Sequence, residues 1–220
     1  MKILVCGDSY SVADPDFLGL HWSEKILNFS SEFELFNLAM GGCSNAMITL
    51  QLLQGLNLKP DFVILSFTSE HRYELDNDID ALPTDLTAMG LSTYQKTRYT
   101  TNVYMKDRGL KQRLETKQSD TFEKLKNYFY ISFCLQTLNQ HKIPFAFSLG
   151  GFEYKQDYSA LINSNYMYNF IKDYTDNEIK TNLWYHGSKP RPYFHVDDNK
   201  VQTLYANECI SRINNVKETN

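Results

Sequence analysis

Over the first 70 residues, short apolar runs alternate with segments whose apolar residues recur at helical spacing. The first run, residues 3–6, is continuous and ends at a glycine, which is typical of a strand buried on both faces. The alternation with short connections predicts right-handed crossovers and a parallel sheet with helices on both faces. The pattern predicts strands at residues 3–6, 33–39 and 59–69 and helices at residues 21–29 and 44–56, the second capped by Ser44 or Asn45.

The alternation stops at residues 74–120, which are polar and charged and have no sustained hydrophobic period. A loop of this length in a compact domain is usually either a functional lid or binding insertion, or flexible. Because no repeat or low-complexity tract separates the two halves, we predict one domain over residues 1–220 with an insertion at about 74–120. Beyond the insertion, the pattern predicts a helix at 121–141, a strand at 143–149, helices at 158–174 and 201–213, and a frayed polar tail at 214–220.

Composition narrows the range of partners and compartments. A chain of 220 residues with a formal net charge of −4 is large enough for a core and lacks the basic surface that nucleic acids or anionic membranes require. No apolar stretch is long enough for a signal peptide or a membrane span, so we expect a cytoplasmic protein. The cysteines have no paired spacing and are predicted to be reduced thiols: Cys6, Cys43, Cys134 and Cys209.

Small and polar residues follow each predicted strand. In an open parallel sheet the carboxyl ends of the strands share one edge, where ligands bind, so these residues are expected to meet there. They are Gly-Asp-Ser-Tyr-Ser at 7–11, Ala-Met-Gly-Gly-Cys-Ser-Asn at 39–45, Phe-Thr-Ser-Glu-His-Arg at 67–72 and Ser-Leu-Gly-Gly-Phe-Glu-Tyr at 148–154, joined by Pro-Tyr-Phe-His-Val-Asp-Asp-Asn at 192–199.

Three of these groups contain the parts of a serine hydrolase. Ser9 supplies a hydroxyl and a backbone N–H, Gly42 near a helix start supplies a second N–H for an oxyanion, and His195 supplies a base. Each also has a structural interpretation: Ser9 as a helix cap, Gly42 as part of a tight turn, and His195 as a surface residue. His71 and His186 are rival bases.

Taken in order, these segments resemble the SGNH (GDSL-type) hydrolase superfamily. The resemblance is carried by VCGDSYS at the first strand, NLAMGGCSN at the second, KPDFVILSFTS at the third and FHVDDNKVQTLYA before the last helix. It implies a flavodoxin-like three-layer α/β/α sandwich with a central parallel sheet of about five strands. It also implies Ser9 as nucleophile, Gly42 as oxyanion donor and His195 as base. In layout the chain is most similar to small SGNH-like proteins of tailed bacteriophages.

Two positions depart from the family pattern. Glu70 stands where the family has an oxyanion-binding asparagine, so Ser69 or Arg72 is the expected third donor, Arg72 being the stronger because it is charged. Pro192 stands where the family has the acid that orients the histidine, which leaves Asp197 or Asp198 for that role, although either could instead cap the last helix. Asp8 and Asn45 complete the predicted oxyanion and substrate-binding set.

The predicted function is a serine esterase that acts on small acyl esters, such as O-acetyl groups of carbohydrates, through an acyl-enzyme. The alternatives are an acyltransferase on the same fold and a non-catalytic binding or structural module. No cofactor is expected. A metal site built from Asp8, Asp14, Asp16 and His195 is not favoured, because their spacing lacks the regularity of a calcium loop.

Overall fold

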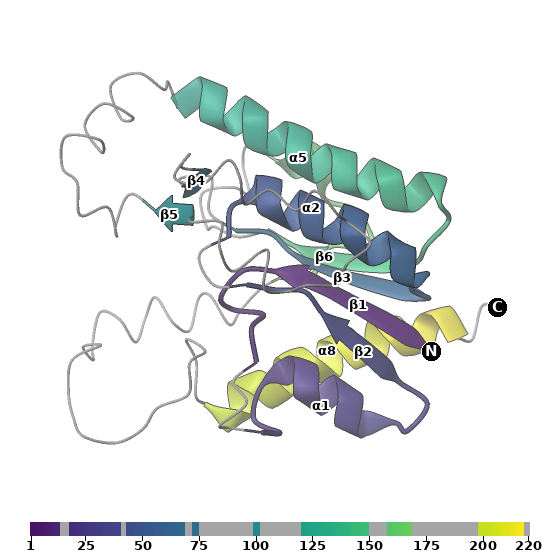
Figure 1. Cartoon of the computed structure of the whole chain (residues 1–220). Helices are drawn as coiled ribbons and strands as arrows, with labels where there is room; N and C mark the ends of the chain where they lie inside the picture. The colour runs from purple at the N-terminus through teal and green to yellow at the C-terminus, as the bar shows by residue number, and fades with distance from the viewer. Residues whose placement is uncertain are drawn as a thin grey trace, which may run out of the picture.

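The centre of the molecule is a parallel sheet of four strands in the order β2-β1-β3-β6 (Figure 1). The structure is a computed structural model that describes residues 1–13, 18–40, 43–68, 72–74, 99–101, 120–149, 158–168 and 198–217. All the strand pairs of this sheet run parallel, as predicted. The strands are β1 (Lys2–Gly7), β2 (Glu34–Asn37), β3 (Phe62–Ser66) and β6 (Phe145–Ser148).

Helices cover both faces of this sheet, which gives three layers (Figure 1). One layer holds α2 (Asn45–Gly55) and α5 (Asp120–Gln140), and the other holds α1 (Trp22–Phe29) and α8 (Asn199–Lys217). A short 3₁₀ helix, η2 (Leu56–Leu58), follows α2. Ser44 is the N-cap of α2 and accepts a hydrogen bond from the backbone N–H of Met47, as the sequence predicts. The α/β/α sandwich predicted from the sequence is confirmed.

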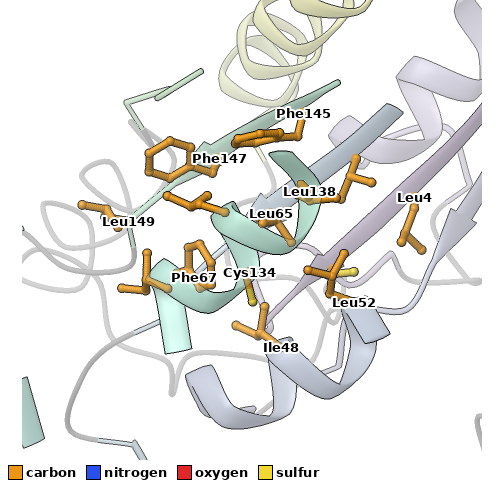
Figure 2. Close-up of a cluster of buried hydrophobic side chains, with 14 of the residues drawn as sticks. Leu4, Ile48, Leu52, Leu65, Phe67, Cys134, Leu138, Phe145, Phe147 and Leu149 are labelled. Atoms are coloured by element: carbon orange, nitrogen blue, oxygen red, sulfur yellow. The ribbon is translucent and has the colours of Figure 1, made fainter. Parts of the chain in front are cut away.

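The two faces of the sheet build two separate cores. Successive side chains of a strand point to opposite faces, so Leu4 and Cys6 of β1 join one core while Ile3 and Val5 join the other. The core under α2 and α5 is shown in Figure 2, where Leu52, Cys134 and Leu138 of these helices approach side chains of the sheet. The core under α1 and α8 contains two large aromatic rings, Trp22 and Tyr205, both almost fully buried.

All four cysteines are buried within these cores and form no disulfide, as predicted. Burial raises the pKa of the Cys134 thiol to about 12 and also raises the pKa of Cys6 and of Cys209. Since the thiolate is the reactive form, these side chains behave as small apolar core residues.

A two-stranded antiparallel pair, β4 (Arg72–Glu74) and β5 (Tyr99–Thr101), joins the beginning of the predicted insertion to its middle. The pairing places Arg72 opposite Thr101 and Glu74 opposite Tyr99, so it brings together residues that are more than twenty positions apart in the chain. The remainder of residues 74–120, up to the start of α5, lies outside the described residues.

The helix predicted at 158–174 is wrong over the described residues 158–168. A 3₁₀ helix, η5 (Ser159–Leu161), is followed by a turn in which Asn163 Oδ1 accepts the N–H of Asn165 at 2.8 Å. This side-chain bond offers the backbone an alternative to a helix. The chain then runs beside β6, where Tyr166 forms a parallel bridge with Phe147 and extends the edge of the sheet.

The tail predicted at 214–220 begins too early, because α8 continues to Lys217. Val216 packs against the core under α8, next to the buried Ile213. This apolar contact extends the helix by one turn past the last strongly hydrophobic residue of the pattern. Residues 218–220 lie outside the described part of the chain.

Candidate active site

Ser9 lies in a tight turn directly after β1, not at the start of a helix. The backbone N–H of Ser11 donates to the Asp8 carbonyl at 2.9 Å, and the N–H of Tyr10 donates to Asp8 Oδ1 at 3.1 Å. The next described helix, α1, begins at Trp22 and is capped by His21. The interpretation of Ser9 as a helix cap is therefore wrong for the described helices.

The turn fixes the direction of the Ser9 amide. In a planar trans peptide the N–H points away from the carbonyl of the preceding residue. Because the Asp8 carbonyl is turned inward to meet the N–H of Ser11, the N–H of Ser9 points away from the interior of the turn. The amides of Tyr10 and Ser11 are committed to Asp8. Ser9 itself is 8% exposed.

Asp8 joins this turn to the end of β3. Its side chain is buried, and its Oδ2 accepts a hydrogen bond of 2.7 Å from Thr68 Oγ1. A buried carboxylate is tolerated when such donors satisfy it. The sequence predicts Asp8 as part of the oxyanion and substrate-binding set. In the structure its side chain points toward Thr68, just beyond the end of β3.

Asn45 at the start of α2 holds Thr68 from the other side. Its Oδ1 accepts the Thr68 N–H at 2.8 Å, and its Nδ2 donates to the Thr68 carbonyl at 3.1 Å and to Asn127 Oδ1 at 2.7 Å. Asn45 is buried, and its amide is engaged within the protein. The N–H, carbonyl and hydroxyl of Thr68 are all hydrogen-bonded, which fixes the position of this residue at the edge of the sheet.

The segment on each side of Gly41 and Gly42 is tied to the end of β1. The N–H of Met40 donates to the Gly7 carbonyl at 3.1 Å. Cys43 Sγ accepts a hydrogen bond from Gln51 Nε2, and the same nitrogen also donates to the Gly7 carbonyl. The residues on either side of the glycine pair, Met40 and Cys43, are therefore both connected to Gly7, Met40 directly and Cys43 through Gln51. Gly7 immediately precedes Asp8 and Ser9 in the chain.

Gln51 and Asn127 are buried residues that hold this edge together by hydrogen bonds, and sequence reasoning missed both. Gln51 is fully buried, and its Oε1 accepts the N–H of Gly7 at 2.8 Å, so its amide satisfies both backbone groups at the end of β1. The available signal was a polar residue within the apolar helix pattern of residues 44–56. A buried amide in that position needs partners.

Replacing Gly7 by alanine is expected to lower the free energy of unfolding by about 2 kcal/mol, because overpacking forces neighbours to move. A Cβ at this position would lie 2.5 Å from Ser11 Oγ and 3.0 Å from Ser66 Cβ. The displacement of Ser11 would also distort the Ser9 turn. Urea unfolding of the two proteins measures the loss, and equal midpoints would contradict the crowding.

Asp198 is the N-cap of α8, as one of the two sequence interpretations predicts. Its Oδ1 accepts the N–H of Lys200 at 2.8 Å and the N–H of Val201 at 3.0 Å. The carboxylate also interacts favourably with the helix dipole at this terminus. The start of α8 is held to α1 by a hydrogen bond from Lys25 Nζ to Asn199 Oδ1.

The structure thus brings Asp8, Ser9 and Asn45 to one edge of the sheet. Arg72 lies in β4, where its backbone alone is described. The other predicted site residues, with their rivals and the two departures from the family pattern, lie outside the described residues: Asp14, Asp16, Gly42, Ser69, Glu70, His71, His186, Pro192, His195 and Asp197.

Within the described residues, no three histidine, cysteine or acidic side chains are grouped so that they could hold a metal ion. In the same part of the chain, no helix combines the length and the apolar character needed to cross a membrane.

The fold and this edge define a flavodoxin-like α/β/α protein with a serine turn after its first strand. No protein-family model matches the chain, and no curated protein matches it. Two solved structures are similar. One, from Desulfitobacterium hafniense DCB-2 and assigned to the lipolytic G-D-S-L family, has 13% identity and a TM-score of 0.47 over 93% of this chain and 97% of that one. The other, a member of the lipolytic G-D-S-L family from Veillonella parvula DSM 2008, has 12% identity and a TM-score of 0.48 over 96% and 99%.

Proposed function

We propose that this protein is a serine esterase that hydrolyses small acyl esters, with Ser9 as the nucleophile. The observation that carries the proposal is the turn after β1, in which Asp8 occupies the amides of Tyr10 and Ser11 while the N–H of Ser9 points outward. An oxyanion hole is built from backbone N–H groups that point toward the position where the ester oxygen becomes charged. The anchoring of Met40 and Cys43 at Gly7 supports Gly42 as the second donor.

The proposed reaction has two halves. Ser9 Oγ attacks the ester carbonyl carbon while His195 takes the hydroxyl proton, and the oxyanion is held by the N–H groups of Ser9 and Gly42. Ser69 or Arg72 is the proposed third donor. When the tetrahedral intermediate collapses, the bond to the alcohol breaks and His195 returns the proton to that alcohol. Water activated by His195 then releases the acid and restores Ser9.

The orienting acid of His195 is proposed to be Asp197. The alternative, Asp198, already accepts two backbone hydrogen bonds at the start of α8. We propose O-acetylated carbohydrates as the substrate class and the cytoplasm, in a phage-infected host cell, as the compartment. The four buried free thiols are consistent with a reducing compartment.

A fluorophosphonate probe tests the proposal directly, because it phosphonylates activated serine hydroxyls. We expect the wild-type protein to be labelled and Ser9→Ala to be unlabelled. Ser11→Ala is the matched control, since it removes a hydroxyl from the same turn and should remain labelled. Absence of labelling in the folded wild type at high probe concentration would contradict the esterase and favour a non-catalytic binding module.

A further inference from the structure

The carbonyl of Tyr10, the residue after Ser9, is held by two ring N–H groups. His21 Nε2 lies 3.1 Å from this oxygen and Trp22 Nε1 donates to it at 2.9 Å. Both side chains are almost fully buried, with exposed fractions of 0% and 1%. Two buried donors on one carbonyl are more than its desolvation requires, since one partner already satisfies a backbone oxygen.

The hydrogen bonds around His21 determine its tautomer. A carbonyl oxygen can only accept, so Nε2 carries the hydrogen that meets Tyr10, and Nδ1 is left as an acceptor. Ser23 supplies the matching donors, with its Oγ 2.8 Å from Nδ1 and its N–H at 3.3 Å. Burial lowers the pKa of His21 to about 4, which keeps the ring neutral and preserves this polarity at physiological pH.

The same chain of contacts reaches the carbonyl of Ser11. Asn37, at the end of β2, donates through Nδ2 to Ser23 Oγ at 3.3 Å and to the Ser11 carbonyl at 2.7 Å. Its Oδ1 accepts the N–H of Ala39 at 3.0 Å, which fixes the orientation of the amide. We call this connected group the turn brace; its members are His21, Trp22, Ser23 and Asn37. Its hydrogen bonds hold the backbone carbonyls of Tyr10 and Ser11.

Trp22 also connects the turn brace to α8. Its backbone N–H donates to Gln202 Oε1 at 2.9 Å, and its ring meets Tyr205 edge to face with centroids 5.1 Å apart. In the sequence, His195 precedes the first residue of α8 by four positions. One side chain thus contacts both the nucleophile turn and the helix that follows the predicted base.

We propose that Trp22 and His21 are positioning residues that hold Ser9 in its reactive orientation by fixing the Tyr10 carbonyl, a role that rests on the proposed esterase function. A nucleophile in a turn can rotate with its peptide planes, and a displacement of about 1 Å can reduce a reaction rate by about 10²-fold. Through the carbonyls of Tyr10 and Ser11, the turn brace holds the two peptide planes that follow the Ser9–Tyr10 peptide and so limits rotation of the turn around Ser9.

The test compares Trp22→Phe with Tyr205→Phe. The first variant removes the donor to Tyr10 and keeps an aromatic ring beside α8. The matched control removes the hydroxyl that donates to Ser148 Oγ from the partner ring of the same contact. Two readouts are measured in each protein: the exchange rate of the Ser11 amide, which reports opening of the turn, and kcat and KM for p-nitrophenyl acetate.

For Trp22→Phe we expect Ser11 exchange to accelerate about tenfold, as for the loss of one hydrogen bond, and kcat to fall about tenfold with KM unchanged. Tyr205→Phe should leave both readouts near their wild-type values. Ser23→Ala, which removes the donor to His21 Nδ1 with little change in volume, should shift both readouts in the same direction as Trp22→Phe.

Three results would overturn the positioning role. The first is unchanged Ser11 exchange in Trp22→Phe, and the second is an equal loss of kcat in Trp22→Phe and Tyr205→Phe. The third is a wild type without esterase activity whose Ser11 exchange still depends on Trp22, because the turn brace would then stabilise the fold alone. Only this third result would also refute the proposed function, so the two failures are distinguishable.

Discussion

Replacement of Ser9 by alanine is expected to lower kcat/KM for p-nitrophenyl acetate by at least about 10³-fold, since loss of a nucleophilic serine removes the covalent route. The change deletes one oxygen and keeps the backbone N–H proposed as an oxyanion donor. Asp8 and the turn brace hold the chain through backbone groups of residues 8–11, so the shape of the turn should persist. The loss should therefore fall on chemistry, not on folding.

Ser11→Ala provides the matched comparison for this measurement. Within the described structure, Ser11 Oγ is buried and has no hydrogen-bond partner, so its removal should leave the rate within about threefold of wild type and the stability unchanged or slightly higher. Hydrolysis rates and urea unfolding are measured for both variants. If Ser9→Ala retained the wild-type rate, or if Ser11→Ala lost activity to the same extent, Ser9 would not be the nucleophile.

Much of the fold could be predicted because buried strands and amphipathic helices each have a characteristic pattern of hydrophobic residues in the sequence. Residues 3–6 and 62–65 are fully buried in β1 and β3, and both segments were visible as continuous apolar runs. The turn that ends β1 could also be predicted, since Gly7 stands where the apolar run stops. The three-layer arrangement then follows from the alternation of the elements.

The errors in the fold come from contacts that a local pattern does not encode. The apolar residues of 158–168 have helical spacing, yet Asn163 bonds the backbone of Asn165 and the chain joins the edge of β6. The end of α8 depends on Val216 meeting the core under that helix. In both cases tertiary packing overrides the local propensity.

The candidate site was predictable as a set of strand ends but not as a network. Gln51 meets Gly7 across 44 residues, and Asn127 meets Asn45 across 82. A sequence shows such polar residues only as interruptions of an apolar helix pattern. The same limit applies to His21 and Trp22, which the pattern assigns to the start of a helix and whose rings also contact the carbonyl of Tyr10 in the turn that contains Ser9.

The second large effect is an expected loss of folding stability at acidic pH, caused by the buried side chain of His21. Burial lowers the pKa of this side chain from 6.5 to about 4, while its hydrogen bond to the Tyr10 carbonyl acts in the opposite direction. Glu24, whose Oε2 accepts the backbone N–H of His21, is the neighbouring charged group in the described capping box. In the unfolded chain the imidazole takes up a proton near pH 6.5, and in the folded protein it does so near pH 4.

The sign of the effect follows from this difference. Above about pH 6.5 the ring is neutral in both states, and its contribution to stability is complete. As the pH falls toward 4, the unfolded state binds the proton first, so stability is lost progressively, by about 3 kcal/mol in total for a shift of this size. Below pH 4 both states are protonated and the loss no longer grows.

Urea unfolding at pH 7 and pH 4.5 measures this loss, and the comparison with a variant separates it from the titration of carboxylates. His21→Asn keeps a side chain suited to capping α1 but does not titrate, so its stability should fall by about 2 kcal/mol less than that of the wild type between the two pH values. His141→Gln is the control, because His141 is exposed at the end of α5. A wild-type pH dependence in His21→Asn would show that the buried ring is not the group that links acid to the stability of the protein.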